Sequence, residues 1–328
     1  MFPERRLRRL RKRNLQPLFR ETRLDASDFV MPLFFDETIE HAVAIESMPG
    51  QSRYPVGDAA PVAERLNKAG VSAVILFGVP AVKDAAAHSA YAETGGVQRA
   101  VAAIKKACPE MVVITDVCAC EYTDHGHCGI IGETSSGEID LLNGPSLALM
   151  QKIAVSHARA GADLVAPSCM LDGQVGAIRT ALDAAGYADV PVMSYSTKFA
   201  SAFYGPFREA AHSGYSFGDR TTYQMDPANG REALLESEMD ADEGADILMV
   251  KPAALYLDVL AKIHEIGLPV AAYQVSGEYA QIKAAAERGW IDEKRCALES
   301  LTCIKRAGAD LIITYYAEDA ARWLREEQ

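Results

Sequence analysis

Three cysteines and two histidines lie in the stretch "DVCACEYTDHGHCG", residues 116–129. If the stretch begins as a β-strand, the side chains of Asp116, Cys118 and Cys120 point to one side, because side chains alternate along a strand. The loop that follows can bring Cys128 back to them. Three thiolates suit Zn²⁺ and leave its fourth tetrahedral position open, as in catalytic zinc sites. The pattern predicts a zinc site.

Two alternatives to zinc stay open for this stretch, a redox pair and thiols without a function. A redox pair more often has the spacing Cys-x-x-Cys. His125 and His127 could also bind a metal, although a third thiolate is the softer donor. The other cysteines have no such neighbours in the sequence, and we expect small core or surface residues at Cys108, Cys169, Cys296 and Cys303.

Two lysines stand at the ends of apolar segments. Lys251 ends "ADILMVK", and Lys198 ends "MSYSTK". Burial and a nearby cation lower the pKa of a lysine from about 10.4 toward neutrality, and the neutral amine can attack a ketone to form a Schiff base. An amine that merely reaches water or pairs with an acid is the alternative for either lysine alone. Two lysines at neighbouring strand ends, beside the cysteines, favour chemistry.

The segment after Lys198, residues 199–225, is rich in aromatic residues and glycine and carries Arg208 and Arg220. Its composition suits a lid whose guanidinium groups hold a carboxylate. A mobile surface loop with solvated arginines would have the same composition.

Eight short apolar segments recur along the chain, separated by stretches long enough for helices. They are residues 30–35, 71–78, 111–118, 163–168, 191–196, 246–252, 269–276 and 310–316. Such segments predict parallel strands that are buried on both faces of a sheet. Three strands are entered through the tripeptide "GAD", at Gly161, Gly244 and Gly308, whose glycine suits the end of a helix.

Eight β–α units without a linker favour an α/β fold of the (β/α)8 TIM barrel type, over residues 29–328, preceded by an extended N-terminal arm over residues 1–28. The alternative, a doubly wound open sheet, usually has a glycine-rich loop after its first strand, and "FFDETIEH" is not one. In a barrel, reactive residues belong at the carboxyl ends of the strands. The candidates meet this condition: Asp116, Cys118, Cys120, Ser168, Lys198, Lys251, Ser276 and Tyr315.

The chain has 328 residues, of which 49% are hydrophobic and 24% are charged. No apolar run approaches the roughly 20 residues of a membrane helix, and the N-terminus lacks a secretory pattern. We therefore expect a cytoplasmic protein without a membrane partner. Seven cysteines, an odd number, argue against a disulfide framework.

The run "RRLRRLRKR", residues 5–13, carries seven positive charges, whereas the whole chain has a net charge of −12, so the remainder carries −19. The arm could be solvated or could pack on a neighbouring copy of the chain. Binding of nucleic acid is the third interpretation, and the acidic body disfavours it because it would repel phosphate.

Several motifs together resemble the delta-aminolevulinic acid dehydratase family, also called porphobilinogen synthase. They are "DVCACEYTDHGHCG", "APSCMLDGQV", "MSYSTKFASAFYGPFREA", "GDRTTYQMDP", "MVKPAALYLD", "YQVSGEYA" and "KRAGADLIITYYA". The resemblance implies a (β/α)8 barrel that assembles as a homo-octamer through N-terminal arms. It also implies condensation of two molecules of 5-aminolevulinate to porphobilinogen, with loss of two waters, in tetrapyrrole (heme) synthesis.

The resemblance also assigns roles to residues. Lys251 would hold the first substrate and Lys198 the second, each as a Schiff base. The remaining substrate-binding positions would be Arg208, Arg220 and Gln224 for the second carboxylate, Ser276 and Tyr315 for the first, and Asp116, Ser168 and Asp172 along the site.

The metal positions follow the zinc branch of the family, because Cys118, Cys120 and Cys128 are all present. Glu236 falls where the family binds an activating, allosteric Mg²⁺ at a subunit interface, although an ordinary exposed helix carboxylate is the alternative. Two positions depart from the family pattern. Cys169 stands where alanine is expected and could add a thiol near the pocket, and Asp124 replaces a serine in the metal loop.

Two other classes of protein remain open. A Schiff-base aldolase on the same barrel would explain a lysine but not the cysteines. A non-enzymatic zinc or redox protein would explain the cysteines but not the lysines.

Overall fold

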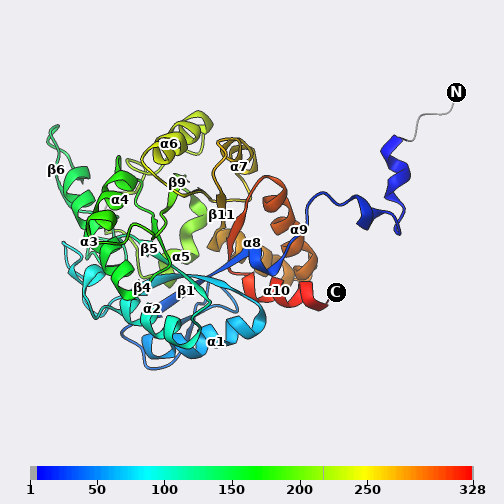
Figure 1. Cartoon of the computed structure of the whole chain (residues 1–328), viewed down its shortest axis with the longest axis horizontal. Helices are drawn as coiled ribbons and strands as arrows, with labels where there is room; N and C mark the ends of the chain where they lie inside the picture. The colour runs from blue at the N-terminus through cyan, green and yellow to red at the C-terminus, as the bar shows by residue number, and fades with distance from the viewer. Residues whose placement is uncertain (1–5, 217, 327–328) are drawn as a thin grey trace.

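The computed structural model describes residues 6–216 and 218–326. Within them, eight parallel strands form a nearly closed barrel with helices between them (Figure 1). The strands are β1 (Phe29–Asp36), β4 (Ala73–Val79), β5 (Val112–Val117), β8 (Leu164–Pro167), β9 (Met193–Lys198), β10 (Ile247–Lys251), β11 (Val270–Gln274) and β12 (Leu311–Thr314). Each coincides with one of the predicted apolar segments. The (β/α)8 barrel is confirmed.

One pair of neighbouring strands in the barrel, β8 and β9, has few backbone contacts. The paired strands run in the order β8-β5-β4-β1-β12-β11-β10-β9, which leaves β8 and β9 to meet at the ends of this path. There the backbone N–H of Val165 donates to the carbonyl of Pro191 at 3.1 Å, and Val165 forms a single parallel bridge with Val192. This contact closes the sheet, so the open-sheet alternative is wrong.

The helices surround the barrel (Figure 1). They are α1 (Ala59–Ala69), α2 (Gly96–Ala107), α3 (Asn143–Ala160), α4 (Gln174–Ala184), α5 (Gly205–Ala210), α6 (Gly230–Asp242), α7 (Leu257–His264), α8 (Ser276–Glu287), α9 (Glu293–Arg306) and α10 (Ala317–Glu326). The glycines of the repeated tripeptide follow α3, α6 and α9 with φ angles of +101°, +100° and +116°. Only glycine adopts such angles without strain, so each of these helices ends where the sequence predicts.

The aspartate of the same tripeptide forms two hydrogen bonds with a neighbouring strand. The backbone N–H of Asp163 donates to the carbonyl of Val113 at 2.9 Å, and its carboxylate accepts the N–H of Val113 at 2.8 Å. Asp246 makes the same pair of bonds with Val192, and Asp310 with Val270. The repeated tripeptide therefore ends a helix and also fixes the register of the next strand against its neighbour.

Shorter elements occur beside the barrel and in the N-terminal arm. They are strands β2 (Val43–Ala44) and β3 (Ser52–Pro55) beside β1, the hairpin of β6 (Ile131–Glu133) and β7 (Ile139–Leu141), and the 3-10 helices η1 (Arg6–Arg11), η2 (Gln16–Phe19), η3 (Ala26–Asp28), η4 (Val56–Asp58), η5 (His88–Tyr91) and η6 (Ala202–Tyr204). None of the helices in the described part of the chain is long and apolar enough to cross a membrane.

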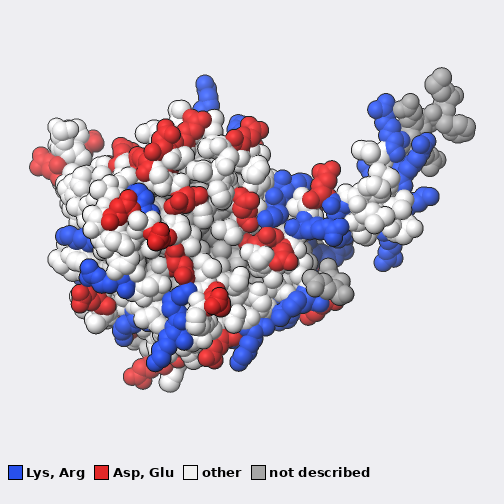
Figure 2. Space-filling model, viewed as in Figure 1, with Lys and Arg blue, Asp and Glu red and all other residues white. Residues whose placement is uncertain are grey.

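The described part of the N-terminal arm extends away from the barrel (Figure 1). Lys and Arg side chains gather along it, as Figure 2 shows. Three large apolar side chains are also exposed there: Leu7, Leu18 and Phe19. Residues 1–5 of the predicted arm lie outside the described residues, and a domain boundary at residue 28 stays a prediction.

Candidate active site

Lys198 and Lys251 are the last residues of two neighbouring strands, β9 and β10. They are direct partners in the ladder between these strands, which places them side by side. Only 5% of Lys198 and 6% of Lys251 is exposed. The structure therefore brings the two predicted lysines together at the carboxyl end of the barrel.

Aromatic rings surround the amine of Lys251. Its Nζ lies 4.3 Å from the ring centre of Tyr273, and 5.0, 5.2 and 5.3 Å from those of Tyr195, Phe207 and Tyr204. Burial, followed by the positive charge of a second lysine, lowers the pKa of this amine to about 7. Contact with rings favours the ammonium by about 0.5–2 kcal/mol, at most about 1.5 pKa units. Burial alone can lower a lysine pKa by 3–5 units, so burial prevails.

A short chain of hydrogen bonds joins Lys198 to Asp116. The Nζ of Lys198 donates to the carbonyl of Ser168 at 2.5 Å, and the Ser168 hydroxyl donates to Asp116 at 3.0 Å. Burial, and then the negative charge of Glu121, raises the pKa of Asp116 to about 7. Burial is the largest single effect on Lys198 and opposes its charged form, but the negative charges of Cys128, Cys118, Asp116 and Cys120 together raise the pKa of this lysine.

The predicted lid segment packs across these strand ends. Arg208 and Arg220 flank the ring of Tyr215, with their guanidinium carbons 5.1 and 6.0 Å from its centre. Arg220 donates to the carbonyls of Gly126 and Ser213, both at 2.9 Å. The Nε atoms of Arg208 and Arg220 are buried without a hydrogen-bond partner among the residues that the structure describes. They are suited to receive a polar ligand.

One small cavity contains half of the predicted site residues. It is lined by Phe77, Asp116, Cys120, Glu121, Ser168, Lys198, Tyr204, Phe207, Arg208, Arg220 and Lys251. Its volume is about 20 Å³, close to the space of one water molecule. A larger molecule therefore requires side chains that line this cavity to move.

Ser276 and Tyr315 lie with Lys251, Tyr273 and Phe207 in an adjoining cluster of side chains that leaves no room for a water molecule. The Ser276 hydroxyl accepts the N–H of Phe207 at 3.0 Å, and the hydroxyls of Tyr273 and Tyr315 are 3.2 Å apart. Lys251 therefore borders two groups of polar side chains, one with the arginines and one with Ser276 and Tyr315.

The thiols form a buried cluster. The Sγ atoms of Cys118 and Cys120 are 3.3 Å apart. Two groups of ligand atoms, each with all members within 4.8 Å of one another, share Cys118: one contains Cys128 and Cys169, the other Cys120 and Glu121. Cys120 and Cys128 belong to different groups. The predicted alternative ligands His125 and His127 belong to neither group. Buried soft donors at this spacing fit a zinc ion.

The position of Cys169 decides between two expectations. We expected a small core or surface residue here, or else a thiol near the pocket, and its Sγ lies 3.6 Å from that of Cys118. The reason is topological, because β8 pairs with β5 and a residue just beyond β8 comes level with the end of β5. Glu121 was missed altogether. It is buried and its Oε2 has no hydrogen-bond partner within the described chain.

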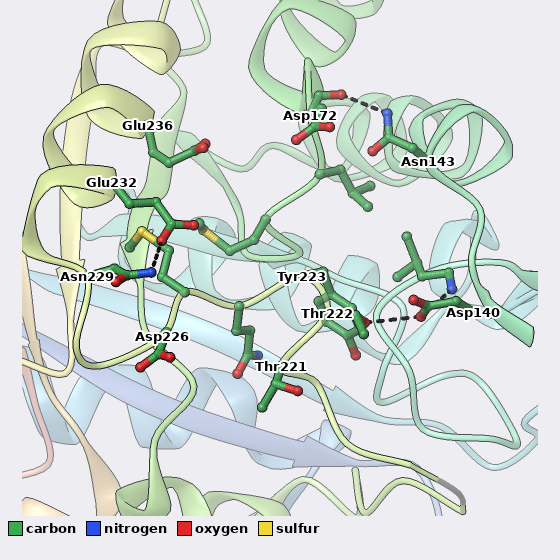
Figure 3. A pocket seen from close by; sticks show the side chains of 15 residues that line it. Asp140, Asn143, Asp172, Thr221, Thr222, Tyr223, Asp226, Asn229, Glu232 and Glu236 are labelled. Atoms are coloured by element: carbon green, nitrogen blue, oxygen red, sulfur yellow. Dashed lines mark hydrogen bonds between the residues drawn. The ribbon is translucent and has the colours of Figure 1, made fainter. Parts of the chain in front are cut away.

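A second hollow, of about 430 Å³, holds three more of the predicted residues, namely Asp172, Gln224 and Glu236 (Figure 3). Glu232 and Glu236 project from α6, and Asp172 lies across the hollow from them (Figure 3). Burial, followed by the charges of Asp240 and Asp172, raises the pKa of Glu236.

Comparison with known proteins decides the family. Residues 4–323 match the family model for delta-aminolevulinic acid dehydratase. The chain belongs to the delta-aminolevulinic acid dehydratase family. Relatives of that name from Synechococcus elongatus, Bacillus subtilis and Escherichia coli are 54%, 51% and 52% identical to it, and the matches span 99%, 97% and 96% of this chain and 100%, 98% and 96% of theirs.

A solved structure agrees with this family. The delta-aminolevulinic acid dehydratase (porphobilinogen synthase) of Toxoplasma gondii, in complex with the reaction product porphobilinogen, is 45% identical, with a TM-score of 0.95. The match covers 100% of this chain and 93% of that one. The chain is thus a dehydratase of tetrapyrrole synthesis, and the aldolase and non-enzymatic alternatives are wrong.

Proposed function

We propose that this dehydratase condenses two molecules of 5-aminolevulinate to porphobilinogen, with loss of two waters, through Schiff bases on Lys251 and Lys198. The pairing of these two buried lysines across β9 and β10 is the observation that carries the proposal. The complex of the Toxoplasma gondii relative with porphobilinogen supports the choice of product.

Lys251 is suited to react first. With a pKa of about 7, about half of its amines are neutral at neutral pH and can attack the ketone of the substrate. Loss of water gives an iminium, which acidifies the neighbouring C–H because it stores the developing negative charge. Asp116, whose pKa is also about 7, can accept and return protons near Lys198.

Holding both substrates on one protein makes their reaction intramolecular, which can lower the barrier by up to roughly 7–11 kcal/mol. Arg208 and Arg220 would bind the carboxylate of the second substrate, since their Nε atoms have no partner within the described chain. Ser276 and Tyr315 would bind that of the first. Gln224 would line the same subsite, and its backbone N–H donates to the carbonyl of Arg220 at 2.9 Å, while Asp172 borders the adjoining hollow.

The thiol cluster would hold zinc through Cys118, Cys120 and Cys128. Zinc bound by three thiolates would carry a net charge near −1 and would be a weak Lewis acid, so its main contribution would be to orient the second substrate beside Lys198. The family match and the buried cluster support a metal requirement. Glu236 would hold an activating Mg²⁺, because a cation would relieve the repulsion among the carboxylates of the second hollow.

We further propose assembly as a homo-octamer through the N-terminal arms. The arm carries seven positive charges opposite a body of −19, and its exposed Leu18 and Phe19 could pack on a neighbouring copy. Neither nucleic acid nor a membrane is needed as a partner.

One preparation, stripped of metal by a chelator, tests the proposed division of labour. It is assayed for porphobilinogen by colour and, after borohydride treatment with 5-aminolevulinate, for a trapped adduct by mass spectrometry. We expect no porphobilinogen, an adduct on Lys251 and recovery of product on addition of zinc. Lys251→Met should abolish the adduct, whereas Lys262→Met, at an exposed lysine of α7, should not. Full product formation without zinc would remove the metal from the proposal.

A further inference from the structure

Cys169 has the same relation to Cys118 as one of the predicted zinc ligands. Its Sγ lies 3.6 Å from that of Cys118, and Cys120 Sγ lies 3.3 Å from the same atom. All three thiols are buried. Cys169 comes from a different strand end, so its approach results from the pairing of β5 with β8 and not from its place in the sequence.

The spacing suits a shared metal ion. Two sulfur atoms bound to one tetrahedral zinc at about 2.3 Å are about 3.8 Å apart. Both distances from Cys118 are close to this value. The Sγ atoms of Cys118, Cys128 and Cys169 all lie within 4.8 Å of one another, while Cys120 belongs to a second group with Cys118 and Glu121, so Cys118 connects all four thiols. A cysteine that only fills core space need not converge on other thiols.

Two cations lie beside the residues that carry these thiols. Lys198 donates to the carbonyl of Ser168, the residue before Cys169. Arg220 donates to the carbonyl of Gly126, two residues before Cys128. Zinc with four thiolates carries a net charge of −2, and these two cations would balance it.

We propose that Cys169 is a fourth thiolate ligand, which would close the zinc site in the absence of substrate. This inference rests on the proposed zinc site. It assigns to the resting enzyme a four-sulfur centre in place of three sulfurs and an open position.

X-ray absorption at the zinc edge tests the inference on the unaltered enzyme. The protein is stripped of metal, reloaded with one equivalent of zinc in a buffer that contains Mg²⁺, and measured without 5-aminolevulinate. We expect four sulfur neighbours at about 2.3 Å. In Cys169→Ala we expect three sulfurs and one oxygen or nitrogen at about 2.0–2.2 Å, with zinc held at least tenfold more weakly against a chelator.

Cys108→Ala is the matched control, because Cys108 is a buried thiol outside the cluster, and its spectrum should equal that of the unaltered enzyme. Three sulfurs and one lighter atom in the unaltered enzyme would overturn the role of Cys169 and leave the zinc site intact. A spectrum without sulfur neighbours would overturn the zinc site itself. The spectrum of the unaltered enzyme decides between these results even if Cys169→Ala does not fold.

Discussion

The amines of Lys198 and Lys251 face the same ring, that of Tyr195, at 5.5 and 5.0 Å from its centre. Two ammonium groups that share one buried space repel each other, and water does not screen them. The surroundings shift the two pKa values in opposite directions: that of Lys251 is lowered to about 7 and that of Lys198 is raised. Near neutral pH, one lysine can therefore be a neutral nucleophile while the other remains charged.

The dependence of Lys251 on its neighbour can be measured. The rate at which borohydride traps 5-aminolevulinate on Lys251 should rise with pH through a midpoint near 7. Lys198→Met removes a charge that lowers this pKa, so the midpoint should move to higher pH. One unit of increase would reduce the neutral fraction at pH 7 about fivefold. Lys262→Met should leave the midpoint unchanged, and an equal midpoint in Lys198→Met would show that the two lysines are not coupled.

The acidic hollow should respond to Mg²⁺ through Glu236. In Glu236→Gln we expect activation by Mg²⁺ to be lost or to require at least tenfold more metal, because a carboxylate ligand is replaced by a neutral amide. Glu238, an exposed carboxylate on the same helix, provides the control Glu238→Gln. Activity is titrated with Mg²⁺ at fixed zinc. Equal activation curves for the two variants would assign the hollow no role in magnesium binding.

Deleting residues 1–13 should yield smaller assemblies with weaker activity, because the deletion removes seven positive charges that face a body of −19. Light scattering gives the size of the assembly. Salt provides a second measurement, since at about 1 M the Debye length falls to about 3 Å and charge attraction across the surface is screened. A full-length assembly that resists salt would assign the contact to the apolar side chains of the arm, and an unchanged oligomer after deletion would contradict the proposal.

Much of the fold could be predicted because it depends on local patterns. Continuous apolar segments identify the buried strands, and the glycine of each "GAD" tripeptide identifies the end of a helix. The hydrogen bonds by which Asp163, Asp246 and Asp310 fix the strand register could not be predicted, because they reach residues on other strands. The contact at Val165 that closes the barrel could not be predicted either, because it joins two strands and the hydrophobic pattern of one segment does not show which strand it pairs with.

The candidate site divides in the same way. Residues at the ends of predicted strands, such as Lys198 and Lys251, meet because the barrel gathers all strand ends. The paths of the connecting loops follow no periodic pattern, so the sequence could not show that Asp172 borders the second hollow and not the lysine cavity. Cys169 needed the strand order as well as the strand positions, because its neighbour belongs to a different β–α unit.

Glu278 leads to a last prediction, since it connects the loop behind Lys251 to the next strand end. One carboxylate oxygen accepts the N–H of Ala254, three residues after Lys251, and the other accepts the N–H of Val275, both at 2.8 Å. Glu278→Gln retains the size of the side chain but replaces one acceptor with a donor, so one of the two N–H groups loses its partner. Loss of a buried hydrogen bond of this kind destabilises a protein by about 1–3 kcal/mol.

We expect a lower Tm and slower trapping of 5-aminolevulinate on Lys251, because the backbone that carries this lysine is less firmly held. Glu287→Gln, an exposed position at the end of the same helix, is the control and should change neither quantity. A lower Tm with unchanged trapping would limit Glu278 to stability, whereas a loss of both would show that the loop must be anchored for Lys251 to react.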